Sequence, residues 1–177
     1  STLAVSPTAN LTAGKIVIVS AVSDNEDATD GATTFHSVSD TQGHTWNKVF
    51  EETETDGAAD DGSTSSLWWT KVQTEIATTD SITLTLGASK SDAVIALVEA
   101  TVASGNTVVA LAPTPTHSTS GTSLSNVRSS LTSREYLFFG LFGAEGEDTA
   151  KTAITNYAEQ HDLVSTTAGQ AIANVQM

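Results

Sequence analysis

Hydrophobic and polar positions alternate along much of this chain in the way that is typical of β-strands. The clearest case is the segment Ile-Thr-Leu-Thr-Leu, in which we expect Ile82, Leu84 and Leu86 to point inward and the intervening threonines to point outward. Two longer apolar runs, residues 14–22 and 93–100, are predicted to be strands that are largely buried. The pattern indicates an all-β chain, folded as one antiparallel β-sandwich that is jelly-roll-like.

A turn is predicted at residues 40–43, Asp-Thr-Gln-Gly, because aspartate can bond to its own backbone and glycine can take a positive φ. The chain then returns through residues 45–50, which predicts a β-hairpin at this point. Trp46 and Phe50 share one face of the returning strand, with Lys48 between them, so both rings are expected to face the core.

The alternation is lost over residues 51–66, which are rich in Glu, Asp, Gly, Ala and Ser, and we expect a long exposed loop there. Glu52 and Glu54 have the spacing of the paired carboxylates in some β-sandwich glycoside hydrolases. A flexible loop is a poor place to fix catalytic geometry, so this pair does not predict catalysis.

The second half of the chain predicts a short strand at 107–112 and a strongly apolar strand at 136–144. Gly140 and Gly143 indicate that the apolar strand bends, or that another backbone approaches it closely.

The length fits a single domain over residues 1–177, with residues 1–12 as an N-terminal arm and 171–177 as a terminal strand. The terminal strand is expected to close the sandwich, to be donated to a neighbouring subunit, or to be followed by residues that are missing from the sequence. No internal repeat is evident.

The composition narrows the classes of function. Seven Lys and Arg against 21 Asp and Glu give a net charge of -14, which disfavours binding to nucleic acid or to anionic membranes. The chain has no cysteine, so disulfides, thiolate metal sites and cysteine nucleophiles are excluded. Its longest apolar runs are far shorter than the ~20 residues that a membrane-spanning helix needs.

Acidic residues gather in segments that are predicted to be loops. Charge runs usually only solvate a loop. Carboxylates that converge from loops at one end of a sandwich could instead bind Ca²⁺, which prefers six to eight flexible oxygen ligands. We therefore expect no cofactor, with Ca²⁺ as the alternative, and its candidate ligands come from two loops: Asp24, Asp27, Asp30, Asp56, Asp60 and Asp61.

No catalytic constellation is recognisable in the sequence. The four histidines lie in separate segments without metal-binding spacing, and surface or strand-face positions are expected for them: His36, His44, His117 and His161. There is no G-x-S-x-G elbow and no phosphate-binding loop. The sequence predicts that the protein is not an enzyme.

Trp68 and Trp69 are adjacent, so on a strand they must point to opposite faces. At most one of them can be fully in the core of a two-layer sandwich. The other is expected to pack under a loop or at a subunit interface, or to stack on a sugar ring.

The order of these features resembles β-sandwich domains of tailed-virus structural proteins, namely capsid decoration or cement proteins, head fibres and tail-associated modules. The segments that carry the resemblance are residues 39–46, 67–69, 82–86 and 96–100. It implies a non-enzymatic role at a virion surface, as an oligomer that contacts copies of itself and a major capsid or other virion protein.

Two other classes stay open. An extracellular, pilus-like filament subunit would insert a terminal strand into the next copy. A carbohydrate-binding module would hold a surface glycan on an exposed tryptophan beside polar residues.

Overall fold

The computed structural model describes residues 1–24, 35–55, 62–87, 92–103, 137, 139–144, 159–164 and 172–176. Within these ranges there is no helix, and therefore none that could cross a membrane. Ten strands are present: β1 (Thr2–Val5), β2 (Ile16–Asp24), β3 (Ser37–Asp40), β4 (Asn47–Glu54), β5 (Ser63–Lys71), β6 (Ile82–Thr85), β7 (Ala93–Ala100), β8 (Gly140–Ala144), β9 (Glu159–Val164) and β10 (Ile172–Gln176).

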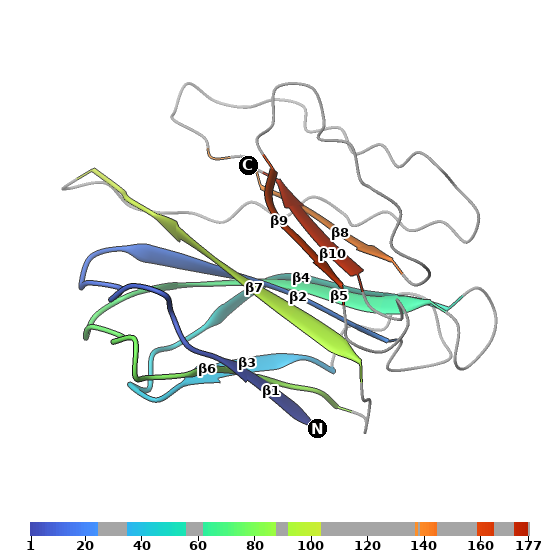
Figure 1. Ribbon diagram of the computed structural model, residues 1–177, viewed down its shortest axis with the longest axis horizontal. Coiled ribbons are helices and arrows are strands. Elements are labelled where there is room, and N and C mark those ends of the chain that lie inside the picture. Colours follow the sequence, from blue (N-terminus) through green and yellow to red (C-terminus); the bar gives the residue numbers. More distant parts are fainter. Residues whose placement is uncertain are drawn as a thin grey trace.

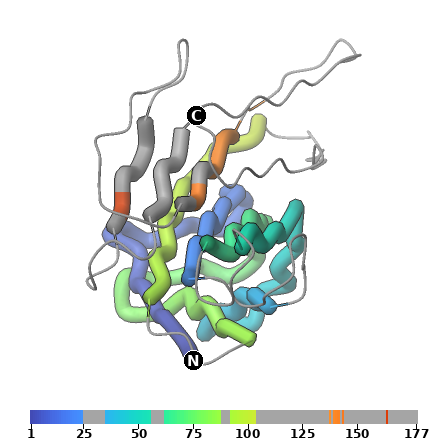
Figure 2. The backbone as a smooth tube through the Cα atoms, turned by 90° about the vertical axis from the view of Figure 1, so that its right-hand side faces the viewer, coloured from blue at the N-terminus to red at the C-terminus, as the bar shows by residue number. Residues whose placement is uncertain are grey.

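The strands form three antiparallel sheets that stack as layers (Figures 1 and 2). The central sheet has the order β4-β5-β2-β7. The sheet β1-β6-β3 covers one of its faces, and the sheet β8-β10-β9 covers the other. The predicted all-β, antiparallel, sandwich-like fold is confirmed, with a third layer added to it.

Strand β2 lies at the centre of this stack and is buried along nearly its whole length. Successive side chains of a strand point to opposite faces, so β2 supplies both cores. Val17 and Val19 face the β1-β6-β3 sheet, whereas Ile16 and Ile18 face the β8-β10-β9 sheet. A strand that is covered on both faces has a continuous run of apolar residues in its sequence. The apolar run at residues 14–22 predicted such a buried strand.

The first core lies between the central sheet and the β1-β6-β3 sheet. Ile82, Leu84 and Leu86 point into this core with exposures of 0%, 0% and 5%, as the alternation predicted. The second core lies on the other side of the central sheet, where Leu141 and Leu163 of the third layer pack against apolar side chains of β2, β5 and β7.

The hairpin predicted around residues 40–43 is wrong. Strand β3 pairs with β6 in the outer sheet, whereas β4 pairs with β5 in the central sheet. The turn therefore carries the chain from one layer to the next and does not fold it back on itself. Polar contacts described below hold this change of direction.

Trp46 and Phe50 do not share a face, contrary to the prediction. The register of β4 shifts between Lys48 and Phe50, a β-bulge that adds one residue to the strand. Trp46 consequently packs in the first core and Phe50 in the second.

The long loop predicted over residues 51–66 is also wrong, because most of its described residues are strand. Residues 51–54 complete β4 and residues 63–66 begin β5, and the two strands pair in register. Hydrophobic alternation is absent here because the inward-facing side chains are polar. Glu51, Thr53, Thr64 and Ser66 are all buried, with exposures of 3%, 0%, 0% and 0%.

The third layer approaches the central sheet closely at Gly143. A Cβ atom at this position would collide with the Ser65 hydroxyl and press on Val22. Only glycine fits there without a shift, as the sequence suggested, although side chains and not another backbone make the approach.

The two terminal segments are both paired within the chain. The predicted arm, residues 1–12, contains β1, which pairs along one side with β6. The predicted terminal strand contains β10, which lies between β8 and β9. The predicted strand at 107–112 lies outside the described residues.

Candidate functional site

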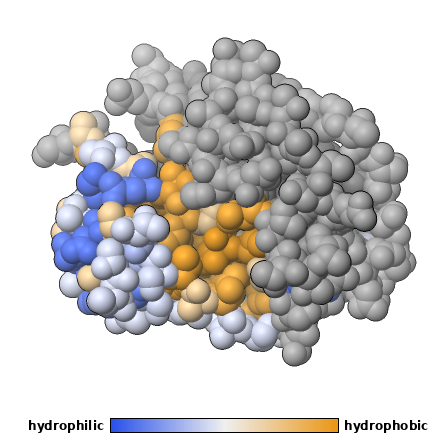
Figure 3. Space-filling view, in the orientation of Figure 1, coloured by the Kyte–Doolittle hydropathy of each residue, from blue (hydrophilic) through white to orange (hydrophobic). Residues whose placement is uncertain are grey.

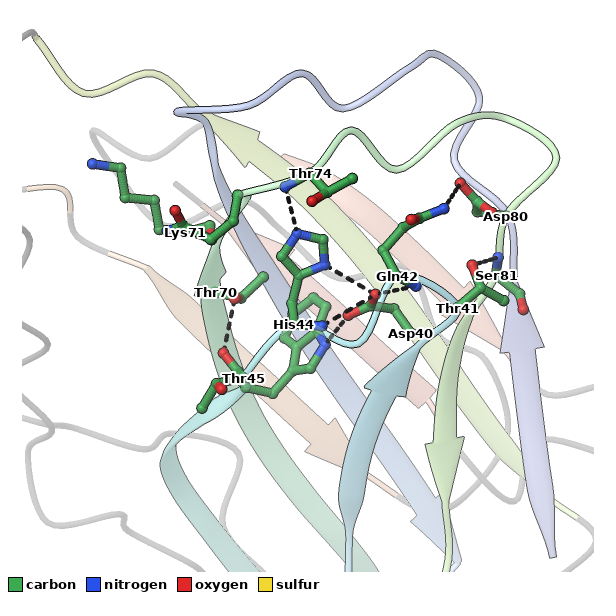
Figure 4. Close-up of polar contacts among 12 residues, drawn as sticks. Asp40, Thr41, Gln42, His44, Thr45, Thr70, Lys71, Thr74, Asp80 and Ser81 are labelled. Atoms are coloured by element: carbon green, nitrogen blue, oxygen red, sulfur yellow. Dashed lines mark hydrogen bonds and ion pairs between the residues drawn. The ribbon is translucent and has the colours of Figure 1, made fainter.

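Two groups of polar side chains lie at the two ends of strand β3. We call the first the corner; it consists of Asp40, Gln42, His44, Trp46 and Thr74 (Figure 4). We call the second the interlayer network; its members are Ser23, His36, Lys48, Glu51, Ser66 and Trp68.

The corner is built around the carboxylate of Asp40, the last residue of β3. Its Oδ1 accepts hydrogen bonds from the backbone N–H of Gln42 (2.8 Å) and from Nδ1 of His44 (2.9 Å). Its Oδ2 accepts a hydrogen bond from Nε1 of Trp46 (2.7 Å). Gly43 has a φ of 76°, the left-handed conformation that the sequence predicted for it. The Asp40 side chain is fully buried.

These bonds fix the charge of the carboxylate. Burial on its own would raise the pKa of Asp40, but the hydrogen bonds from His44, Trp46 and the Gln42 backbone outweigh burial and lower the pKa below its usual value. Asp40 is therefore ionised at neutral pH.

His44 uses both of its ring nitrogens. Nε2 accepts the backbone N–H of Thr74 (3.2 Å), so the ring is neutral and its proton resides on Nδ1, which donates to Asp40. An aspartate–histidine pair of this kind occurs in hydrolases, where the second nitrogen takes a proton from a nucleophile. Here a backbone amide occupies that nitrogen, and the pair joins two stretches of chain.

Further bonds attach the corner to its surroundings. The hydroxyl of Thr70 on β5 donates to the carbonyl of Thr45 (2.8 Å), and Nε2 of Gln42 donates to Asp80 (2.9 Å) (Figure 4). Asp80 also accepts the N–H of Ala77, and the hydrogen bonds from Ala77, Gln42 and Thr41 together lower the pKa of Asp80. The corner is thus tied to the central sheet and to the turn before β6.

In the interlayer network, Glu51 binds the chain that enters β3. Its Oε1 accepts the N–H of Phe35 (2.6 Å), and its Oε2 accepts the N–H of His36 (3.1 Å) and the ammonium of Lys48 (2.9 Å). The Glu51 side chain is fully buried, whereas that of Lys48 is 31% exposed. A carboxylate of the central sheet therefore accepts hydrogen bonds from two backbone amides of the outer layer.

His36 lies between two serines of the central sheet. Ser23 donates its hydroxyl to the carbonyl of Asp24, so it accepts the Nε2–H of His36 (3.0 Å). Nδ1 of His36 then accepts the hydroxyl of Ser66 (2.8 Å), and Ser66 in turn accepts the Nε1–H of Trp68 (3.0 Å). His36 is buried, although a surface or strand-face position was expected for it, because no local pattern indicates its serine partners.

Of the predicted calcium ligands, only Asp24 lies in the described part of the chain, at the end of β2, where its N–H donates to the carbonyl of Asp92. Asp27, Asp30, Asp56, Asp60 and Asp61 lie outside it. Among the described residues, no three His, Asp or Glu side chains are grouped as a metal site would need. The calcium site stays a prediction.

Trp68 and Trp69 point to opposite faces of β5, as predicted. Trp68 is 7% exposed and packs in the first core, with the Lys48 ammonium 5.1 Å from its ring centroid. Trp69 is half-buried and packs against the second core. Both faces of the strand are covered because the central sheet has a layer on each side.

The other residues singled out in the sequence are dispersed. Glu52 and Glu54 lie on β4 and not in a loop, opposite Ser65 and Ser63. His161 lies on β9, far along the chain from both polar groups, and His117 is outside the described residues.

Comparison of the chain with protein-family models, with curated proteins and with solved structures found no match. The geometry of the described residues is therefore what any functional conclusion has to start from.

Proposed function

We propose that this protein is a non-enzymatic structural component of a virion surface, most specifically a capsid decoration protein that stabilises the shell through subunit interfaces. The partners in this proposal are copies of the chain itself and a major capsid protein. The proposal rests on how the buried polar groups are used, together with the family resemblance of the sequence.

The observation that carries the proposal is that both buried carboxylates, Asp40 and Glu51, hold separate parts of the fold together. Asp40 and His44 join the corner to the segment around Thr74, while Glu51 binds the entry to β3. Reactive side chains in an active site need an open position for substrate. These side chains are instead saturated with internal partners, which favours a rigid scaffold.

The distribution of apolar residues on the surface, together with the net charge, supports the same proposal. Apolar surface gathers across the middle of the face shown in Figure 3, where Figure 1 places β7, beside a hydrophilic region. Ile95 and Leu97 of β7 are only half-buried. Contiguous apolar surface on an otherwise strongly acidic protein is a means of contacting another subunit, and the net charge of -14 keeps the free chain in solution.

The proposal is tested by measuring the solution mass of the purified chain by light scattering, with and without a chelator. We expect a trimer or larger assembly whose mass does not change on chelation. A stable monomer at all concentrations would contradict self-assembly, and a loss of mass on chelation would place a cation at the interface.

The virion location needs a separate measurement. An antibody against the chain should label the outside of particles banded in a density gradient from the source culture. Detection only in the particle-free fraction would contradict a virion role even if the chain is oligomeric.

A filament subunit is the second candidate, and the position of β1 favours it. This N-terminal strand lies at the edge of its sheet and pairs with β6 alone among the described strands. The test uses a chain that lacks residues 1–5 and a synthetic peptide of that sequence. Binding of the peptide to the truncated chain would indicate strand exchange. A truncated chain that neither binds the peptide nor loses assembly would contradict it.

A further inference from the structure

The segment between β5 and β6 is held by two different kinds of contact. At its ends, Val72 and Ile76 are buried and exchange backbone hydrogen bonds with the chain before β2: Gly14 N to Val72 O, Val72 N to Lys15 O, Leu11 N to Ile76 O, and Ile76 N to Leu11 O. Between these ends, residues 73–75 are exposed.

The middle of this segment is held by His44. The N–H of Thr74 donates to Nε2 of the ring, and Nδ1–H of the same ring donates to Asp40 (Figure 4). The bond to Thr74 exists only while Nε2 carries no proton. A protonated ring would present an N–H to the N–H of Thr74, and two donors cannot bond to each other.

The charged groups around the ring allow it to take a proton without losing its place. Asp40 is in contact with Nδ1 and, with its lowered pKa, stays ionised under mildly acidic conditions. Lys71 extends away from the ring (Figure 4), and Glu75 is engaged by Asn10. Asp80 bonds to Gln42 and to Thr41 beside it, and not to the ring. If Nε2 takes a proton, the ring therefore keeps its hydrogen bond to Asp40 and loses only the one from the Thr74 amide.

We propose that His44 is an acid-sensitive clip: its protonation releases the exposed loop of residues 73–75 while Val72 and Ile76 stay in place and the Asp40–His44 contact persists. Histidine is the side chain whose charge changes in the mildly acidic range, so the loop has one shape at neutral pH and another in acid. The inference rests on the corner and is independent of the proposed virion role.

The test is a pH titration of the full chain by NMR. At neutral pH, long-range proton–nitrogen spectra should show His44 as the neutral form with its proton on Nδ1. On acidification, the Thr74 amide should shift with the same midpoint as the His44 ring. Its exchange with solvent, corrected for the intrinsic pH dependence, should rise about tenfold, as expected for the opening of one hydrogen bond.

The amides of Val72 and Ile76 are the internal control, and they should keep their protection. Loss of protection at all three positions together would contradict a local clip, and so would a Thr74 amide that ignores the His44 midpoint. In the variant His44→Gln, whose side chain can accept from Thr74 at any pH, the Thr74 titration should disappear. If this variant does not fold, the comparison of midpoints in the unaltered chain still decides the matter.

Discussion

The corner and the interlayer network both attach strand β3 to the rest of the protein, but the backbone and side-chain groups that bind their two carboxylates lie at different distances along the chain. Asp40, at the end of β3, binds groups only two to six residues ahead of it. Glu51 reaches back 15 and 16 residues to the amides of His36 and Phe35, at the start of β3. A four-residue strand is thus fixed at both ends by a buried carboxylate.

The difference separates two roles. The corner sets a local change of direction, so that the chain leaves the outer sheet and enters the central one. The interlayer network acts between two layers, because Glu51 of the central sheet accepts hydrogen bonds from the amides of Phe35 and His36 before β3. We expect loss of either carboxylate to destabilise the fold. The larger effect is expected at the corner, because one of the three donors to Glu51 is the partly exposed ammonium of Lys48.

The largest effect is expected for Asp40→Ala. The change leaves the indole N–H of Trp46, the ring N–H of His44 and the amide of Gln42 without their acceptor, in a place where the side chain is fully buried. Bonds to a charged group contribute about 1.5–3 kcal/mol each and are not additive, so the free energy of unfolding should fall by about 3–4 kcal/mol. Urea unfolding measures this.

Asp80→Ala is the control for that experiment, since it removes an exposed carboxylate of the same region. Its unfolding midpoint should move much less than that of Asp40→Ala. Equal shifts for the two variants would mean that the corner is held by something other than the buried carboxylate.

A smaller loss is expected for Glu51→Ala. Two backbone amides lose their acceptor, but the partly exposed ammonium of Lys48 can turn to water. The free energy of unfolding should fall by about 2–3 kcal/mol. Lys48→Met, which keeps an unbranched side chain and removes the ammonium that lies over Trp68, should cost under about 1 kcal/mol. If Lys48→Met costs as much as Glu51→Ala, the ion pair and not the amides carries the stability.

Ser66→Ala tests the far side of the interlayer network. It removes the hydroxyl that bonds to Nδ1 of His36 and to the indole N–H of Trp68, and it should cost about 1–2 kcal/mol. Ser65, its neighbour on β5, points to the opposite face, and Ser65→Ala should change the free energy of unfolding by under about 0.5 kcal/mol. Similar losses in both variants would indicate that the effect comes from β5 itself.

The strands that could be predicted from the sequence are those whose inward residues are apolar. Strands β2, β6 and β7 have this character, and they were predicted with nearly correct bounds. The facing ends of β4 and β5 were missed because their inward positions are Glu, Thr and Ser. Hydropathy cannot distinguish a buried, hydrogen-bonded polar residue from an exposed one, and only the partner across the layer makes the difference.

The two candidate sites differ in the same way. The Asp-Thr-Gln-Gly turn and the positive φ of Gly43 follow from short-range chemistry, so part of the corner could be predicted. The sequence did not predict that this turn carries the chain from one sheet to another, because β3 pairs with β6, which lies far along the chain. The position of His36 depends on serines 13 and 30 residues away, and no local pattern indicates such partners.

The smallest expected effect is a change in how the free energy of unfolding depends on pH. It shows whether Asp40 stabilises the corner through its charge or only through its hydrogen-bonding geometry. The pKa of Asp40 is lower in the folded chain than the value of about 4 expected when unfolded, so between the two values the unfolded state binds more protons. The stability due to this group is complete above about pH 4 and is lost as the pH falls through the folded value. In urea unfolding from about pH 6 to about pH 3, Asp40→Asn should therefore show a shallower loss in acid than the unaltered chain, even though it starts from a lower stability. Equal slopes would mean that Asp40 holds the corner by its hydrogen-bonding geometry alone, because a group whose pKa does not change on folding cannot make stability depend on pH.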